Sequence, residues 1–212
     1  MDNVRNADTT GFKACTARVD DKSATIMLDM TQGSMVATGN PLDLGIQGDG
    51  FFTVKTAHGT AYTRAGNLVI NSLGEVVLAI GDGYRLMPPV TVPVSATYTS
   101  IGTDGTIAYV PPGATIKKTA GQIQIARFAN PRGLHYLGGS LYMEAPDSGP
   151  PIHLMPGAFG AGQILSGYLE ESNVDLIHEQ IRLRFLTEWR DVIFQALAGQ
   201  KSRLPLPPAT RP

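Results

Sequence analysis

The stretch from residue 39 to residue 52, GNPLDLGIQGDGFF, constrains the fold more than any other part of the chain. Two turn signals enclose a short apolar run. In the first turn, Pro41 fixes its own φ angle and biases Asn40 away from helix. In the second turn, Gly48 and Gly50 can adopt the positive φ angles that tight turns need. The stretch therefore predicts a rigid corner that leads into a β-domain.

Between these turns, Leu42, Leu44 and Ile46 occupy alternate positions, as in a half-buried strand. The run FFTV after the second turn also has a strong strand preference. We interpret the whole block as a corner motif with an architectural role. Its members are Gly39, Asn40, Pro41, Leu42, Asp43, Leu44, Gln47, Gly48, Asp49, Gly50, Phe51 and Phe52.

Short apolar runs separated by glycine-containing turns continue after the corner, which favours an antiparallel sheet or small barrel. Asp104-Gly105 between Ile101 and Ile107 is a hairpin signal. Only one short strand, near residues 26–30, is expected before the corner, and residues 146–162 are too rich in proline and glycine for a regular element. We expect four regions: a connecting segment over 1–38, a β-domain over 39–162, a helical segment over 163–199 and a disordered tail over 200–212.

The pattern changes to helix at Ser172, which we expect to be the N-cap, with Asp175 at the third helical position. No proline or glycine interrupts residues 174–198. Apolar residues recur at helical spacing in a packing stripe made of Val174, Ile177, Ile181, Phe185, Val192 and Ala196. The predicted fold class is mainly β with this long C-terminal α-helix. The stripe packs either on the chain's own β-domain or on another helix.

Composition argues against several functions. The net charge of −1 gives no electrostatic reason to bind nucleic acid, and no apolar run is long enough to insert in a membrane. The two Gly-Asp-Gly turns lack the third glycine of a dinucleotide loop, and the four histidines do not have metal-ligand spacing. We therefore expect no catalytic residues, no metal and no cofactor. The N-terminus shows no apolar signal-peptide core.

Two further motifs frame the β-domain. A TTGFK motif near the N-terminus comprises Thr9, Thr10, Gly11, Phe12 and Lys13. A GYLEESNV motif before the helix contributes Gly167, Leu169, Glu170, Ser172, Asn173 and Val174. With TGNPLDLGIQGDGFFTV and GTAYTRAGNLVINSLGEVV, these motifs closely resemble the axial proteins of the bacterial flagellum, the rod and hook subunits.

The resemblance implies a structural subunit of the periplasmic rod in the flagellar basal body, exported by the type III apparatus without signal cleavage. The subunit would form a helical homopolymer and contact other rod and hook proteins. Paired terminal helices would form the inner layer and the β-domain the outer layer. The family's N-terminal helix is largely absent from residues 1–38. Distal-rod members are the most similar; the alternatives are a proximal-rod paralogue or a truncated paralogue that binds rod components without polymerising.

Overall fold

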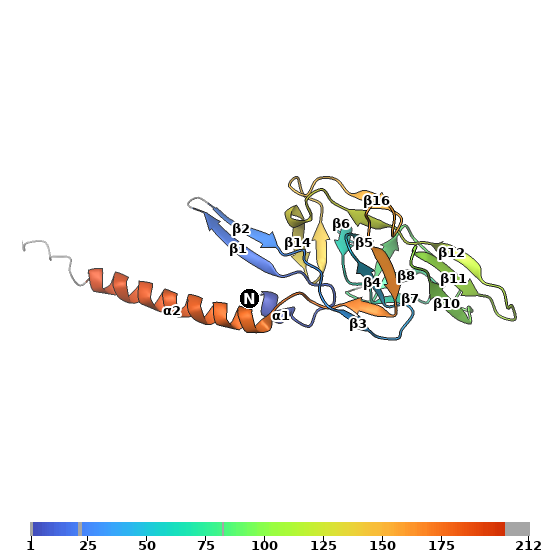
Figure 1. The fold of residues 1–212 in the computed structure, drawn as a ribbon, viewed down its shortest axis with the longest axis horizontal. Helices are drawn as coiled ribbons and strands as arrows, with labels where there is room; N and C mark the ends of the chain where they lie inside the picture. The colour runs from blue at the N-terminus through green and yellow to red at the C-terminus, as the bar shows by residue number, and fades with distance from the viewer. Residues whose placement is uncertain (1, 21–22, 82, 202–212) are drawn as a thin grey trace, which may run out of the picture. The chain divides into compact units, whose positions relative to one another are not determined.

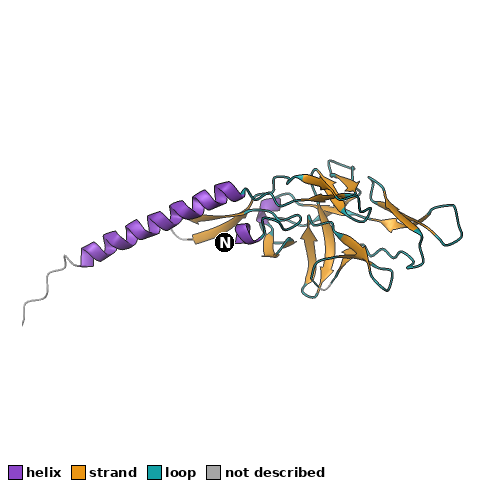
Figure 2. Cartoon of the chain, turned by 90° about the horizontal axis from the view of Figure 1, so that it is seen from below, coloured by secondary structure: helices purple, strands orange, loops and turns teal. Residues whose placement is uncertain are grey.

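The computed structural model describes residues 2–20, 23–81 and 83–201, and the chain divides into two units, Met1–Val174 and Asp175–Pro212 (Figure 1). The first unit contains a four-residue helix, α1 (Asp2–Arg5), followed by strands. The second unit contains the long helix α2 (Leu176–Lys201). Figure 2 shows the long helix in purple and the strands in orange, with short helical segments in the first unit. The predicted fold class, mainly antiparallel β with one long C-terminal helix, is confirmed.

The strands of the first unit all pair antiparallel within the described residues. Their bounds are β1 (Cys15–Asp20), β2 (Ser23–Leu28), β3 (Met35–Ala37), β4 (Leu44–Gln47), β5 (Phe51–Thr56), β6 (Gly59–Thr63), β7 (Leu68–Ile70), β8 (Val76–Leu78), β9 (Tyr84–Met87), β10 (Tyr98–Ile101), β11 (Thr106–Val110), β12 (Lys118–Gln122), β13 (Ile125–Arg127), β14 (His135–Gly138), β15 (Leu141–Met143), β16 (Ile152–Leu154), β17 (Gln163–Ser166) and β18 (Tyr168–Glu170). A short 3-10 helix, η1 (Pro131–Gly133), forms at the predicted turn before β14.

Strand β5 is central to the largest sheet, whose order is β14-β15-β6-β5-β9-β8-β7, with β13 and β16 also attached. Successive side chains of a strand point to opposite faces, and here both faces are covered. Phe52 and Val54 belong to the main core. Phe51 belongs to a second cluster with Tyr62, Phe128 and other residues. Because both faces of β5 are buried, apolar residues occupy adjacent positions in FFTV and do not simply alternate with exposed polar residues.

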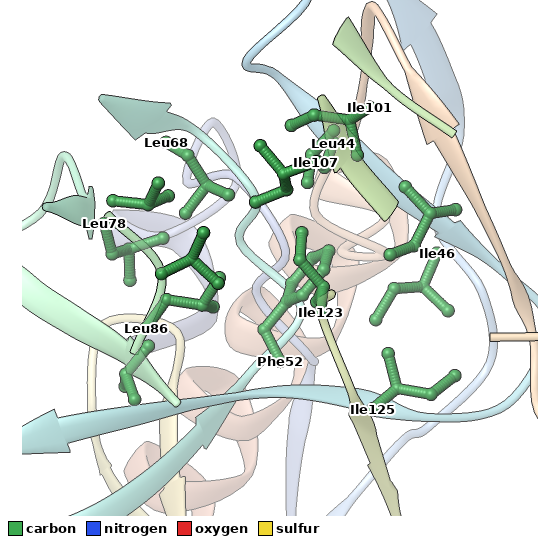
Figure 3. Packing of buried hydrophobic residues seen from close by; sticks show 14 of the residues in the cluster. Leu44, Ile46, Phe52, Leu68, Leu78, Leu86, Ile101, Ile107, Ile123 and Ile125 are labelled. Carbon is green, nitrogen blue, oxygen red and sulfur yellow. The ribbon is translucent and has the colours of Figure 1, made fainter. Parts of the chain in front are cut away.

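The main core joins side chains from strands that are far apart in the sequence (Figure 3). Leu44 of the corner motif and Ile46, which follows it in β4, are fully buried there beside Phe52, with 0% of each residue exposed. Ile107 and Ile123 come from the segment after residue 100 and are equally buried. The alternation predicted for the corner therefore directs its apolar side chains into the core.

The corner motif pairs with the segment that leads out of the β-domain. Strand β4 pairs with β17, with Ile46 opposite Ile164, and β3 pairs with β18, with Met35 opposite Glu170. The segment by which the chain enters the β-domain, β3 and β4, thus lies beside the segment by which it leaves, β17 and β18. An antiparallel pair of this kind brings distant sequence motifs within bonding distance of each other.

Two segments have more structure than the sequence predicts. Residues 1–38 were expected to hold one strand, but β1 and β2 form a hairpin there. Residues 146–162 were expected to be irregular, yet they contain β16, which pairs with β13. In both cases strand pairing overrides a weak local preference. The predicted hairpin at Asp104-Gly105 is confirmed, since it connects β10 and β11.

Helix α2 begins at Leu176, so the predicted N-cap was wrong. Asp175 caps this helix: its Oδ1 accepts hydrogen bonds of 3.0 Å from the backbone N–H of both Ile177 and His178. Ser172 instead accepts a hydrogen bond from the backbone N–H of Val174, ahead of the helix. The helix continues to Lys201, and the remainder of the predicted tail lies outside the described residues. No described helix is long and apolar enough to cross a membrane.

Candidate functional site

The most unusual site in the first unit is a buried ionic cluster formed by Lys13, Arg64 and Glu170. The Lys13 Nζ lies 2.6 Å from the Glu170 Oε1, and the Arg64 Nε lies 3.1 Å from the Glu170 Oε2. All three side chains are at most 5% exposed. Because an unpaired buried charge is very unfavourable, each of these groups depends on the others. We call this cluster the ionic junction.

Backbone groups complete the junction around both cations. The Lys13 Nζ donates a hydrogen bond of 2.6 Å to the carbonyl of Thr31. The Arg64 guanidinium donates to the carbonyls of Gly50 and Gly48, at 2.7 and 2.8 Å. Arg64 therefore holds the second turn of the corner motif in place.

Glu170 is bound mainly through Oε1, which also accepts a 2.9 Å hydrogen bond from the backbone N–H of Gly33. Its backbone carbonyl accepts a 2.7 Å hydrogen bond from Gly11. Oε2 accepts no hydrogen bond from the described residues, so its interaction with Arg64 is chiefly one of charge. One residue of the GYLEESNV motif thus connects to the TTGFK motif through both its side chain and its backbone.

Burial lowers the pKa of both cations. Desolvation lowers the pKa of Lys13 below its ordinary value, and the attraction of Glu170 opposes this effect. The pKa of Arg64 is likewise lowered by desolvation, again opposed by Glu170. A buried ion pair of this kind makes folding depend strongly on all its partners being present.

Asn173 forms a second connection beside the ionic junction. Its Oδ1 accepts a 2.7 Å hydrogen bond from the backbone N–H of Ala14, and its Nδ2 donates at 2.8 Å to the carbonyl of Asp29 and at 3.0 Å to that of Thr31. The backbone N–H of Asn173 donates to the carbonyl of Phe12 at 3.3 Å. This single side chain therefore joins three separate segments.

The TTGFK motif is also fixed by the aromatic cluster. Phe12 is fully buried and makes an edge-on contact with Tyr136, with ring centroids 5.9 Å apart. The hydroxyl of Tyr142 accepts a 2.9 Å hydrogen bond from the backbone N–H of Lys13, and burial raises the pKa of Tyr142. The hydroxyl of Ser140 donates to the carbonyl of Thr10. These contacts attach the N-terminal motif to the hairpin formed by β14 and β15.

Glycine is required at two of the predicted positions. Gly11 has a φ of +66°, and an added Cβ would lie 2.3 Å from the backbone nitrogen of Ala65. Gly48 has a φ of +102°, and a Cβ there would lie 3.2 Å from the Cα of Gly162. The positive φ angles predicted for Gly48 and Gly50 are both present. They let the backbone carbonyls of the corner reach Arg64.

The rest of the corner motif stabilises its own turn. The Oδ1 of Asn40 accepts a 3.2 Å hydrogen bond from the backbone N–H of Leu42, and its Nδ2 donates at 3.1 Å to Asp43. The backbone N–H of Gly167 donates at 2.8 Å to the carbonyl of Asp43. Gly39 also has a positive φ, of +73°. The corner and the GYLEESNV motif are thus in direct contact.

The structure brings the three predicted motifs together, and it adds residues that sequence reasoning missed. Arg64 lies in a segment that supports the family resemblance, but no local pattern identified it as a site residue. Gln32 was also missed: its Nε2 donates at 3.2 Å to the carbonyl of Ile46, and its Oε1 accepts at 3.0 Å from the backbone N–H of Gly48. Only the tertiary fold shows that these side chains complete the corner.

The packing stripe belongs to the second unit, apart from Val174, and is exposed there. The exposed fractions of Ile177, Ile181 and Val192 are 71%, 61% and 62%. Helix α2 exposes further large apolar side chains that the predicted stripe omitted: Leu186, Trp189, Ile193, Phe194 and Leu197. The requirement for a helical partner stays a prediction.

The described residues contain no group of three or more histidine, cysteine or acidic side chains that could hold a metal ion. The ionic junction consists of one carboxylate and two cations, bound to each other and to the backbone carbonyls of Thr31 and Gly50. It fixes the entry and exit of the β-domain against each other.

The protein-family model described as the flagellar hook protein FlgE/F/G D1 domain matches residues 45–109. This segment begins within β4 and ends within β11. This matched segment, which includes Arg64 of the ionic junction, is similar to the hook and rod proteins of the bacterial flagellum. Individual relatives distinguish rod proteins from hook proteins. The flagellar basal-body rod protein FlgG of Borreliella burgdorferi is 31% identical over 85% of this chain and 80% of its own length. The chain belongs to the flagellar basal-body rod protein family.

Other relatives carry the same name. FlgG of Bacillus subtilis is 42% identical over 74% of this chain, and FlgG of Caulobacter vibrioides is 39% identical over 74% of it. The matched part covers 60% of each of these two relatives, so the chain spans less than two thirds of their length. FlgF of Rhizobium meliloti, also called a flagellar basal-body rod protein, is 29% identical over 96% of this chain.

Proposed function

We propose that the chain is a structural subunit of the distal part of the flagellar basal-body rod and assembles with copies of itself into a helical shaft. The observation that carries this proposal is the ionic junction. It unites Lys13, Arg64 and Glu170, which come from three sequence motifs that resemble rod and hook proteins. A rigid junction of this kind suits a subunit that transmits torque, because it resists displacement of the β-domain.

The exposed helix supports assembly. A helix with Ile181, Phe185 and Val192 all more than half exposed presents apolar surface that is normally buried. Contacts between terminal helices of neighbouring subunits would bury it. If each copy makes the same heterologous contact with the next, the assembly is an open helical filament. In this proposal the role is non-catalytic.

The proposal extends to partners and location. We infer that the subunit contacts other rod and hook proteins, passes through the type III export apparatus without signal cleavage, and resides in the periplasmic rod. The test is deletion of the gene followed by electron microscopy of isolated hook–basal bodies. The proposal expects rods that stop before the distal segment, restored by the full chain. Complete distal rods in the deletion strain would contradict it.

A proximal-rod role is the second candidate, because the FlgF relative aligns with 96% of this chain. The same micrographs separate the two roles. Loss of a proximal subunit should leave no rod beyond the export apparatus, whereas loss of a distal subunit should leave a short proximal rod. A paralogue that binds rod components without polymerising would leave rod length unchanged.

A further inference from the structure

A cavity of about 190 Å³ lies beside the ionic junction. Its lining includes the cations Lys13, Arg64 and Arg127, the carboxylate Asp49, and the rings of Phe51 and Phe128. On the same measure a single water needs roughly 10–15 Å³, so the cavity has room for a larger polar group. Lys13 and Arg64 are almost fully buried, whereas the Arg127 and Asp49 side chains are 33% and 76% exposed. Among the charged residues that line the cavity, the most deeply buried are therefore positive.

Positive charge exceeds negative charge around this cavity. Lys13 and Arg64 share one carboxylate, Glu170, and Arg127 pairs with Asp49 at 3.3 Å across the more exposed part. The three cations that line the cavity are thus paired with two carboxylates, of which only Asp49 lines the cavity. Asp29 attracts Lys13 only weakly and does not line the cavity. A buried excess of one positive charge favours an anion more strongly than an exposed charge does.

The cations also keep donors available. An ammonium group has three N–H donors, and the described residues accept two of those of Lys13, at Thr31 and Glu170. A guanidinium has five: the Arg64 Nε lies 3.1 Å from Glu170, and Nη1 and Nη2 each donate to one described carbonyl, so one N–H on each of Nη1 and Nη2 remains. The Arg64 guanidinium also lies 5.8 Å from the centre of the Phe51 ring, which closes one side of the cavity. A carboxylate entering the cavity would find both charge and hydrogen-bond donors.

Arg127, which lines the cavity, also binds the backbone of Phe159. The Nη1 of Arg127 donates a 3.0 Å hydrogen bond to the carbonyl of Phe159. Phe159 is 87% exposed and has a φ of +48°, a conformation that is unfavourable for a bulky residue. Both properties are unfavourable in the isolated chain. Contact with an apolar group of a protein partner would bury the ring and so offset the cost of its exposure.

We propose that this cavity accepts the carboxylate of a glutamate or aspartate side chain from a partner protein, and that Phe159 contacts an apolar side chain next to that acid. The acid lies between Arg127 and the buried pair Lys13 and Arg64, and its stem packs against the rings of Phe51 and Phe128. The surface thus recognises an acidic residue with an apolar neighbour. This inference goes beyond assembly of the rod, because it assigns a binding site to the single chain.

The first test uses NMR of the full chain, titrated at constant ionic strength with N-acetyl-glutamate methylamide. The N–H signals of Arg64 and Arg127 should shift in a saturable way, whereas N-acetyl-glutamine methylamide should have no such effect. Arg127→Gln should weaken binding about twofold to fivefold, as expected for removal of one partly exposed charge. Arg85→Gln, which removes an exposed arginine paired with Glu75, is the matched control and should leave binding unchanged.

The second test examines Phe159 with two peptides, acetyl-Gly-Glu-Leu-Gly-amide and acetyl-Gly-Glu-Gly-Gly-amide. Wild-type protein should bind the leucine peptide more tightly. Phe159→Gly should abolish that preference without unfolding the chain, since glycine adopts a positive φ readily.

Three outcomes would overturn the proposal. Equal shifts with the glutamine probe would show that the cavity does not select a carboxylate. Binding of free acetate as tight as that of the peptides would show a general anion site rather than a site for a protein side chain. A leucine preference that survives Phe159→Gly would exclude Phe159 from the contact.

Discussion

Lys13 and Glu170 are 157 positions apart in the sequence, yet their side chains form a 2.6 Å ion pair with almost no exposure to solvent. The pair connects the TTGFK motif to the GYLEESNV motif, and Arg64 extends it to the turn of the corner motif through Gly48 and Gly50. The three motifs are therefore parts of one structural site.

Removal of the shared carboxylate should strongly destabilise the first unit. Glu170→Gln leaves Lys13 and Arg64 buried without their counter-charge, and breaking a buried pair in this way typically costs about 3–5 kcal/mol. Urea unfolding followed by circular dichroism of the β-sheet signal would measure the change. Glu171→Gln, at the adjacent exposed position, is the control and should change the free energy of unfolding by less than about 0.5 kcal/mol. Equal effects of the two substitutions would contradict the role of the junction.

The corner should not tolerate a side chain at Gly48. Gly48→Val forces a β-branched residue to a φ of +102° and places its Cβ close to Gly162, which should cost roughly 1–3 kcal/mol. Gly113→Val is a useful comparison, because Gly113 has a φ of +70° but an added Cβ there would have no atom within 4 Å. We expect the larger loss of thermal stability at Gly48. An unchanged unfolding curve for Gly48→Val would refute the proposed rigidity.

Helix α2 should depend on Asp175 for its first turn. Asp175→Ala removes the oxygen that accepts hydrogen bonds from Ile177 and His178, so backbone chemical shifts in the first turn should move towards coil. Asp175→Asn retains an acceptor and should preserve most of the helical signal. Ser172→Ala should leave it intact, because Ser172 lies outside the helix. A larger effect at Ser172 would support the N-cap that the sequence predicted.

The hairpin turn at Asp104 gives a prediction for acid pH. The backbone N–H and hydroxyl of Thr106 donate to the Asp104 carboxylate at 3.0 and 2.8 Å, and these bonds lower the pKa of Asp104 below 3.8. The resulting stability is present above pH 3.8 and is lost as the pH falls through the lowered pKa. Thr106→Val removes one bond and should raise the pKa of Asp104 in an NMR titration. A pKa unchanged by the substitution would contradict this assignment.

Local signals explain which parts of the fold were predictable. The positive φ angles at Gly48 and Gly50 followed from glycine chemistry, and the hairpin at Asp104-Gly105 followed from its turn sequence. Strand β16 was missed because its pairing with β13 depends on a partner distant in the sequence, as in Arg127 opposite Ile152. The helix start was misplaced because Ser172 and Asp175 are both good capping residues.

The candidate site was predicted as separate motifs and not as a cluster. TTGFK and GYLEESNV were recognisable through the family resemblance, but sequence spacing could not show that Lys13 and Glu170 form a pair. Arg64 and Gln32 had no distinguishing pattern, since a single arginine or glutamine in a β-rich segment is most often a surface residue. Their roles follow from the tertiary contacts alone.

The central claim, that the chain is a structural subunit of the rod, is tested most directly by quantitative mass spectrometry of purified hook–basal bodies. We predict that the chain is present in multiple copies per basal body, in an amount comparable to the other rod subunits, and that it disappears from the particles when Glu170→Gln replaces the wild type. Purified, complete basal bodies that lack the chain would contradict the account.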